Sequence, residues 1–560
     1  MARVRRIASA LVATVLAAGG LAGCGSSGDG SGDDVGQGDA NTTPVSLAVA
    51  VDALPSTLDP ALARTPSERV IAAAINTPLL TYRRSTDTDA ATLEPALAGD
   101  LPTLSDDATE YRFTLRPGLL YADGQVVTAS DVERSIAHAS VAAVDPELRA
   151  VLDDIEGAPS ADGQTLSGVV SDDSTGTVVV KLRHPDGRIP LALADPATAP
   201  LPALPARDLK TLPSSTGPLR VARVTATSIE LVANPLRARI ATVPAAHATQ
   251  VSITTREPTA AALASGAVDL VLDPAAGKVP AKMTAIDASS GAVWSLVLPA
   301  RGEFSARTVR QDLAQALDRR GLAAATDPTV RSTTPRGASG TTPSTGASST
   351  TPSGGEVSTT PITTHGSSMV DEDVDGGLVP ACGLLPAYVV GAVVRDDCPP
   401  SPTITKTKPL LGETVRVAVA SAGVGEQASA QVVATAVEAL GGQAVFVRAA
   451  DPAHAALSTN SSADAAIVRA SPSLPHPAGW LGAASEVDDL IHREVLADTA
   501  GPLTGSADRW SSLEKRAVQR AVVVPIAVGR TQVLVGPAIA RSSVQIHPVL
   551  GLDLTALAPR

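Results

Sequence analysis

The residues best suited to chemistry in this sequence are its eight histidines, and their spacing builds no known catalytic or metal-binding motif. The chain has no G-x-S-x-G elbow, no Walker phosphate loop and no H-E-x-x-H zinc motif. A histidine without a partner at a suitable spacing is more often a satisfied surface or core residue. We therefore predict that the protein is not an enzyme and binds no metal or cofactor. The histidines considered are His138, His184, His454, His476, His492 and His547.

The first of the three cysteines lies in a motif for lipid attachment. A basic segment at residues 3–6 precedes an apolar run at about residues 7–18, which is too short to span a bilayer of ~30 Å as a helix. Residues 21–24, LAGC, then match the bacterial lipobox. The match implies a signal peptide at residues 1–23 and a lipidated thiol on Cys24. The alternative is an ordinary buried cysteine after a secretory signal.

The other two cysteines, Cys382 and Cys398, are predicted to form a disulfide that closes a short loop. A secreted chain folds in an oxidising compartment, where paired thiols persist as disulfides. The alternative is a pair of metal ligands, but no further histidine or cysteine lies near enough in the sequence to complete such a site.

The composition limits the class of protein. A chain of 560 residues exceeds what one hydrophobic core usually supports, so two or three domains are expected. Aromatic residues make up 2% and hydrophobic residues 44%, which predicts cores built from Ala, Val and Leu. The net charge of −13 argues against a nucleic-acid surface, which would need basic stripes.

The stretch 111–139 contains the clearest local structure. Alternating apolar residues at 111–115 predict a half-buried strand, and the pairs Pro-Gly at 117–118 and Asp-Gly at 123–124 predict turns. The segment 128–131, TASD, offers a hydroxyl N-cap with a carboxylate three residues later, so a helix is expected to follow. These elements alone indicate an α/β protein of unspecified function.

The same stretch resembles the signature of family 5 solute-binding proteins, the extracytoplasmic receptors of dipeptide, oligopeptide and nickel ABC importers. Shorter matches to the family are LDP at 58–60, LEPALAG at 93–99, STGP at 215–218 and the helix predicted at 305–320. The signature is carried by Arg116, Gly118, Tyr121, Asp123, Gly124, Val127, Thr128, Ala129, Asp131 and Val132.

The resemblance implies an α/β, two-lobed periplasmic-binding-protein-like fold (class II, family 5) with a cleft between the lobes. In the second lobe, strands are predicted at 415–420, 444–447 and 464–468 with a helix at 431–440, an alternation typical of a parallel sheet. The expected divisions are a signal peptide 1–23, a flexible tether 24–44, lobe I 45–300 with an extra subdomain at about 80–205, lobe II 301–520 and a return to lobe I at 521–560.

Residues 331–368 consist almost entirely of Ser, Thr, Pro and Gly. Such a segment cannot bury enough apolar area to offset the entropy of ordering, so we predict a disordered insertion at 330–378 within lobe II. The acidic residues at 371–375 lack the spacing of an EF-hand and are interpreted as a solvated run.

Candidate ligand-binding residues follow from the resemblance: Arg64 and Thr77 from the first lobe and Trp480 from the second. Peptide-binding relatives often have an acid shortly after a Gly-Trp pair, and here the acid is missing after Trp480. Arg64 lies about where peptide binders can carry an acid. Both departures favour an uncharged or anionic ligand over an ordinary peptide. Trp480 could equally be a core residue.

The predicted function is the lipid-anchored solute-binding component of an ABC importer, for peptides or a related small solute. The expected partners are the solute and the permease subunits, with no nucleic acid, and the protein is expected to be a monomer on the extracytoplasmic face of the cell membrane. The alternative is a non-transport regulatory lipoprotein on the same scaffold, acting in cell-envelope glycolipid synthesis.

Overall fold

The computed structural model describes residues within the unit 44–560. The predicted signal peptide and tether, Cys24, Cys398 and most of the predicted insertion lie outside the described residues. The structure describes residues 45–83, 91–157, 159, 161–205, 209, 212–237, 240–255, 265–272, 279, 282–319, 322, 377–393, 402, 407–421, 423–458, 461–502 and 506–560.

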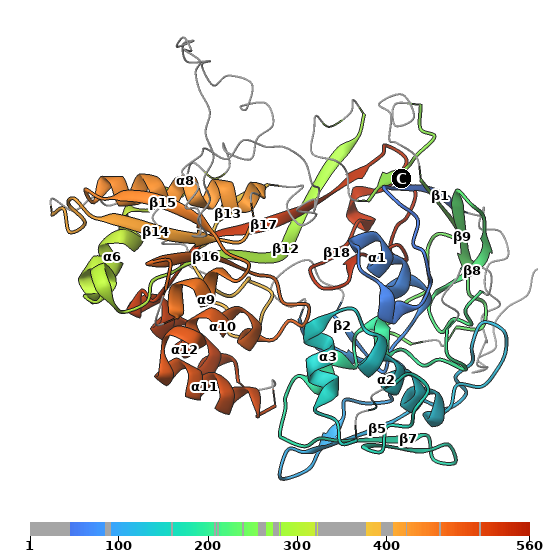
Figure 1. Ribbon diagram of the computed structural model, residues 1–560. Coiled ribbons are helices and arrows are strands. Elements are labelled where there is room, and N and C mark those ends of the chain that lie inside the picture. The colour runs from blue at the N-terminus through green and yellow to red at the C-terminus, as the bar shows by residue number, and fades with distance from the viewer. Residues whose placement is uncertain are drawn as a thin grey trace, which may run out of the picture. The chain divides into compact units, whose positions relative to one another are not determined.

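One sheet of eleven strands runs through the described part of the chain (Figure 1). Its members are β1 (Ser46–Val51), β8 (Leu219–Val224), β9 (Ser228–Ala233), β10 (Gln250–Thr255), β11 (Leu270–Val271), β12 (Thr284–Val297), β13 (Leu378–Pro380), β14 (Thr414–Val419), β15 (Gln443–Arg448), β16 (Ala465–Ala470) and β17 (Val523–Val535). The order across the sheet is β15-β14-β16-β12-β17-β11-β1-β10-β9-β8, with β13 paired to β17. Strands β8 to β11 and β1 form what we call the first wing, and β14 to β16 form the second wing.

The antiparallel pair β12 and β17 joins the two wings. Their first and last pairs in the register are Thr284 with Val535 and Val297 with Val523. The register shifts between Ser289 and Val293, where the chain passes from one wing to the other. Because an irregular register bends a strand pair, the connecting strands are expected to bend at this point. The first half of β12, residues 284–290, was not predicted from the sequence.

The second wing has the parallel βαβ arrangement predicted from the sequence. Strand β14 pairs in parallel with both β15 and β16, and α8 (Val424–Ala439) connects β14 to β15. The predicted helix at 431–440 is confirmed but begins seven residues earlier, at Val424. Gly441, at φ +93°, follows the helix in the left-handed conformation that favours glycine.

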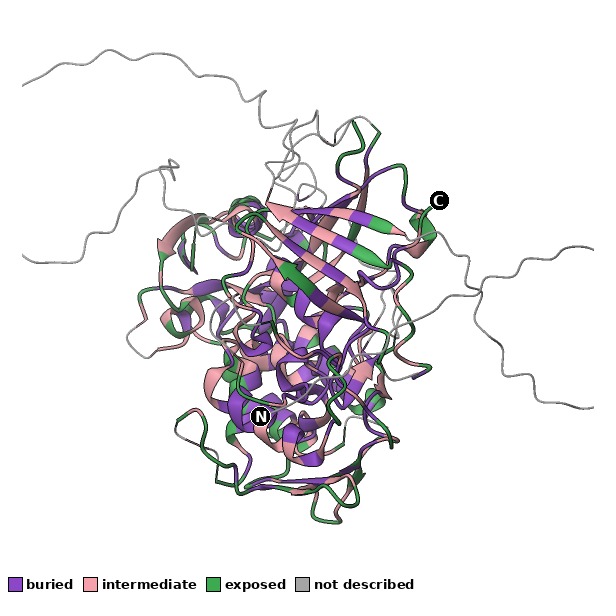
Figure 2. Ribbon diagram, turned by 90° about the vertical axis from the view of Figure 1, so that its right-hand side faces the viewer, coloured by how far each residue is buried: buried purple, intermediate pink, exposed green. Residues whose placement is uncertain are grey.

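The signature stretch forms part of a separate four-stranded sheet, β4-β5-β7-β6. The strand and the capped helix predicted there are both confirmed, as β5 and α2, and Thr128 and Asp131 form the capping box. Figure 2 shows the mixture of buried and exposed residues on this side of the molecule. The elements of this region are β4 (Thr103–Leu104), β5 (Glu110–Thr114), α2 (Ala129–Ala142), α3 (Pro146–Asp153), β6 (Val169–Asp172) and β7 (Thr177–Lys181).

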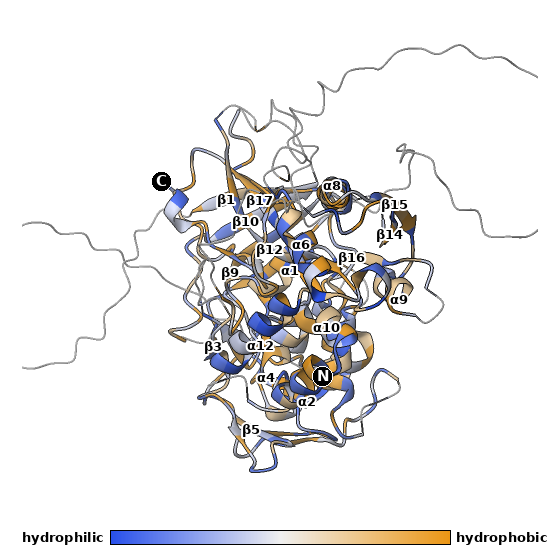
Figure 3. Ribbon diagram, turned by 90° about the vertical axis from the view of Figure 1, so that its left-hand side faces the viewer, coloured by the Kyte–Doolittle hydropathy of each residue, from blue (hydrophilic) through white to orange (hydrophobic). Residues whose placement is uncertain are grey.

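Figure 3 shows hydrophobic and hydrophilic residues mixed along longer helices such as α1 and α12. Trp510 in α12 is fully buried. Helices of the described residues are all too short or too polar to cross a membrane. The other elements are η1 (Pro60–Leu62), α1 (Pro66–Ile75), β2 (Leu80–Tyr82), β3 (Leu93–Pro95), α4 (Ile189–Ala192), η2 (Pro196–Thr198), η3 (Gly302–Phe304), α6 (Arg307–Ala316), α9 (Pro452–Leu457), α10 (Pro477–Val487), α11 (Asp489–Thr499), α12 (Ala507–Arg520), η6 (Arg541–Ser543), β18 (Ile546–His547) and β19 (Gly551–Leu552).

Candidate ligand-binding site

A cavity of about 560 Å³ lies where α1 and α3 face the end of β16 and the irregular turn of β12. This volume lies within the range of pockets that hold small molecules. We call it the central cleft. It is lined by Arg64, Pro66, Arg69, Asp145, Pro146, Glu147, Ser290, Tyr388, Arg469, Ser471, Pro472, Ser473, Pro548 and Val549.

Two arginines reach the central cleft from the start of α1. Thr65 and Glu68 form a capping box there, and the Glu68 carboxylate also accepts a hydrogen bond of 2.7 Å from the backbone N–H of Arg64. This fixes the backbone from which Arg64 extends. The side chains of Arg64 and Arg69 are exposed, and neither guanidinium has a hydrogen-bond or ion-pair partner within the described part of the chain. Arg64, a predicted ligand-binding residue, thus lines the cleft.

A third arginine, Arg469, approaches the central cleft from the end of β16. Its guanidinium carbon lies 5.4 Å from the ring centroid of Trp294, which is fully buried in β12. A guanidinium over an aromatic face is attracted by the ring's electron density. The stacking therefore limits the movement of Arg469 and holds one face of its guanidinium against the protein.

The two acids in the lining are already engaged. The side chain of Asp145 caps α3 and accepts hydrogen bonds from the backbone N–H groups of Glu147 and Leu148 at 2.9 and 3.0 Å. The Glu147 carboxylate crosses to the chain after β16, where it accepts from the backbone N–H of Ser473 at 2.8 Å, from the Ser473 hydroxyl at 3.2 Å and from the N–H of Leu474 at 3.2 Å.

Burial raises the pKa of the Glu147 carboxyl above its ordinary value, although these hydrogen bonds act in the opposite direction. Glu147 and Ser473 are 326 residues apart in the sequence. The contact between them therefore closes one end of the central cleft by tying α3 to the segment after β16.

The floor of the cleft is the turn of β12. Ser290 lines the cleft, and the next residue, Gly291, has φ +77°. A Cβ at Gly291 would lie 2.5 Å from the Tyr388 hydroxyl, so the position requires glycine for both its conformation and its space. The backbone carbonyl of Gly291 accepts a hydrogen bond of 2.9 Å from Nε1 of Trp480, whose ring meets Tyr388 edge-on.

The structure brings together only part of the predicted site. Trp480 is 3% exposed and lies behind Gly291 and Tyr388, outside the residues that line the cleft. Thr77 is buried and exchanges hydrogen bonds with Thr216: its N–H donates to the Thr216 hydroxyl, which donates to its carbonyl. It lines a different, much smaller cavity of about 80 Å³. Ligand roles for Thr77 and Trp480 stay predictions.

Sequence reasoning missed most of the lining, including Arg69, Glu147, Tyr388 and Arg469. Arg69 lies five positions after Arg64, a spacing that could have been noticed. Glu147 and Arg469 carry no such signal, because their significance depends on contacts between distant segments. Cys382 is disulfide-bonded, but the other cysteine lies outside the described residues, so its pairing with Cys398 stays a prediction.

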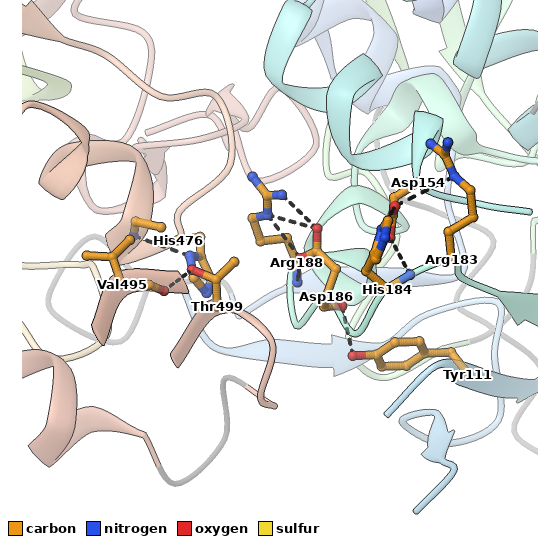
Figure 4. Close-up of polar contacts among 10 residues, drawn as sticks. Tyr111, Asp154, Arg183, His184, Asp186, Arg188, His476, Val495 and Thr499 are labelled. Atoms are coloured by element: carbon orange, nitrogen blue, oxygen red, sulfur yellow. Dashed lines mark hydrogen bonds and ion pairs between the residues drawn. The ribbon is translucent and has the colours of Figure 1, made fainter. Parts of the chain in front are cut away.

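A second contact between distant segments joins the loop 183–188 to the end of α11 (Figure 4). The backbone N–H of Gly187 donates to the carbonyl of Thr499 at 2.8 Å. Arg188 forms an ion pair with Asp186 across 2.7 Å. A Cβ on Gly187 would lie 2.0 Å from the carbonyl oxygen of Gly501, so these two segments of the backbone approach as closely as glycine allows.

His476 lies on the α11 side of this contact and is fully buried. Its Nδ1 accepts from the backbone N–H of Ala478, and its Nε2 has no hydrogen-bond partner among the described residues. Burial, with a smaller contribution from the positive charge of Arg188, lowers the pKa of His476 to about 3. It is therefore neutral at physiological pH.

His138 is the histidine with the strongest polar contacts, and it lies away from the central cleft. Its Nε2 and Nδ1 each lie 2.9 Å from a carboxylate oxygen, on Asp59 and Asp162 respectively. Asp59 also caps η1, so it fixes the LDP turn to α2. The prediction of a satisfied core histidine is confirmed here. No group of three or more potential metal ligands is found among the residues that the structure describes.

Comparison with known families gives this cleft a context. Residues 92–353 match the family model described as bacterial extracellular solute-binding proteins, family 5 Middle. The middle of this chain is therefore similar to family 5 proteins. The resemblance inferred from the signature stretch is thereby confirmed, and so is the two-lobed α/β fold expected of a family 5 protein. No curated protein matches the sequence.

Several solved structures share the fold at low sequence identity. The clavulanic acid biosynthesis oligopeptide binding protein 2 is 19% identical, with a TM-score of 0.66 over 92% of this chain and 95% of its own. HbpA2 from Haemophilus parasuis is 14% identical, with a TM-score of 0.68 over 92% and 100%. The periplasmic murein tripeptide binding protein MppA, in its unliganded open form, is 15% identical, with a TM-score of 0.68 over 92% and 98%.

Proposed function

We propose that this family 5 protein is the solute-binding component of an ABC importer and that it captures a small solute in the central cleft. Cys24 would anchor it by lipid to the extracytoplasmic face of the cell membrane, and the permease subunits would be its partners. The single observation that carries the proposal is that the cleft is lined from α1 and α3 on one side and from the end of β16 on the other. A solute held there contacts both parts at once.

The irregular register between Ser289 and Val293 supports the same proposal, because a bend in the connecting strands would allow the two sides to close over the solute. Peptides are one candidate class, since relatives of similar fold are named for oligopeptide and murein tripeptide binding. Another relative of the same fold was solved with agropinic acid, so small acids are a second class. No described feature favours the regulatory alternative.

Native mass spectrometry of the purified protein tests the proposal. Ser471 is exposed, lines the cleft and lies just after β16, so a tryptophan there would fill the cavity. Ser462 is also exposed and lies just before β16, outside the cleft lining, which makes it a matched control. We expect a co-purifying or added small solute to bind the protein and Ser462→Trp but not Ser471→Trp. Absence of any bound solute from a library of peptides and small acids would contradict the proposal.

A further inference from the structure

We infer that the solute carries an anionic group, a carboxylate or a phosphate, and that Arg64, Arg69 and Arg469 recognise it. This inference rests on the proposed function and adds the chemistry of the ligand. It starts from the charges that line the central cleft, which are three arginines and two acids.

The acids of the lining are outnumbered by the arginines and are held by the protein itself. Asp145 accepts two backbone hydrogen bonds at the start of α3. Glu147 accepts three from Ser473 and Leu474, and its burial disfavours the charged form. With three arginines against these two acids, the charged side chains of the lining favour an anion over a cation.

The two arginines at the start of α1 are available. Arg64 and Arg69 are exposed and line the cleft, and their guanidiniums make no hydrogen bond or ion pair within the described part of the chain. A guanidinium offers five N–H donors in a planar fork that matches the two oxygens of a carboxylate or phosphate. The geometry thus offers donors to an anion without breaking any existing hydrogen bond of these side chains.

Arg469 adds a positive charge from the opposite side of the cleft. Its guanidinium carbon lies 5.4 Å from the centroid of the Trp294 ring, which holds the charge at this side of the lining. One anionic group between α1 and the end of β16 would contact charges on both sides. The attraction would therefore favour binding of the anion, and it would also favour the arrangement in which the two sides close over it.

The inference is tested by comparing acids with their neutral analogues. Binding of glutarate, inorganic phosphate and Glu-containing dipeptides is measured by calorimetry at constant ionic strength, together with glutaramide as the neutral analogue of glutarate. At least one anion is expected to bind at least about tenfold more tightly than neutral compounds, because hydrogen bonds to charged groups are the stronger ones. The anion that binds most tightly shows whether the solute carries a carboxylate or a phosphate.

The decisive variant is Arg64→Gln with Arg69→Gln, which is expected to weaken anion binding by about tenfold or more. Arg448→Gln is the control, because Arg448 is exposed at the end of β15 and lies outside the cleft lining. This substitution also removes positive charge, as the double variant does. The inference is overturned if neutral solutes bind and the acids do not, or if the double variant binds anions like the control. If no solute of any charge binds, the proposed function fails as well.

Discussion

At the scale of single residues, Arg64 and Trp480 have different places at the central cleft. Arg64 lies in the cleft lining, whereas Trp480 lies one layer deeper and donates a hydrogen bond to the carbonyl of Gly291. Whether an aromatic ring faces a cavity or the core depends on packing between segments that are distant in sequence.

His476 makes a prediction about acid stability. Its pKa is lowered to about 3 by burial, whereas the unfolded value is near 6.5. The unfolded chain thus binds more protons between these values, so stability is full above pH 6.5 and falls as the pH drops. Between pH 7 and 5 this histidine should cost about 2 kcal/mol of stability.

Urea unfolding at both pH values measures this loss, and His476→Asn should reduce it because asparagine does not titrate. His454→Asn is the control, since His454 lies on the surface helix α9. Equal pH dependence in the wild type and His476→Asn would show that the buried histidine does not contribute as described.

The contact of His138 with Asp59 and Asp162 predicts the opposite pH dependence. The two carboxylates raise the pKa of His138 above its ordinary value despite its burial. The stabilisation is therefore complete below about pH 6.5 and is lost as the pH rises through the higher folded value. Asp59→Asn should lower the stability by about 1–3 kcal/mol at pH 6, and by less at pH 8. Thermal unfolding at the two pH values checks this, and a penalty that grows at pH 8 would contradict it.

At the scale of elements, the contact between α3 and the segment after β16 depends on one carboxylate. Glu147→Ala removes the acceptor of the Ser473 and Leu474 N–H groups, which should then exchange their hydrogens roughly tenfold faster. Hydrogen exchange followed by mass spectrometry of residues 469–476 measures this. Glu110→Ala is a suitable control because Glu110 pairs with an exposed arginine on β5. Unchanged exchange in Glu147→Ala would mean that this contact is not formed in solution.

The packing of the end of α1 against the segment before β8 gives a second prediction for an element. A Cβ on Gly217 would lie 2.5 Å from the backbone carbonyl carbon of Ile75, so Gly217→Ala must displace the end of α1. We expect a loss of about 1–3 kcal/mol. Gly482→Ala in α10 is the matched control, because its added Cβ meets nothing within 4 Å and alanine favours a helix. Thermal unfolding of both variants decides, and a Gly217→Ala protein as stable as the wild type would refute the close packing.

Elements with strong local signals could be predicted from the sequence. The capping box at Thr128 and Asp131 marked the start of α2, and alternating apolar residues marked β5. The first half of β12 was missed because residues 284–290 are mostly intermediate in burial and polar in type, and they form a strand only because β17 pairs with them. The register shift at Gly291 likewise has no local signature beyond the glycine.

At the scale of the whole molecule, the family resemblance supplied what local patterns could not. Periodicity alone indicated an α/β protein, whereas the signature stretch indicated the two-lobed fold, and the match of residues 92–353 confirmed it. The cleft residues other than Arg64 come from contacts between distant segments, as the 326-residue separation of Glu147 and Ser473 shows. Such contacts follow from the assembled fold rather than from any local pattern in the chain.

Hydrogen exchange of the purified protein, with and without the solute that native mass spectrometry detects, tests the central claim most directly. A solute enclosed in the central cleft should slow exchange at residues 64–69, 145–148 and 469–474 together, because these segments line it from both sides. Protection confined to one of these segments, or centred on the cavity around Thr77, would contradict the account.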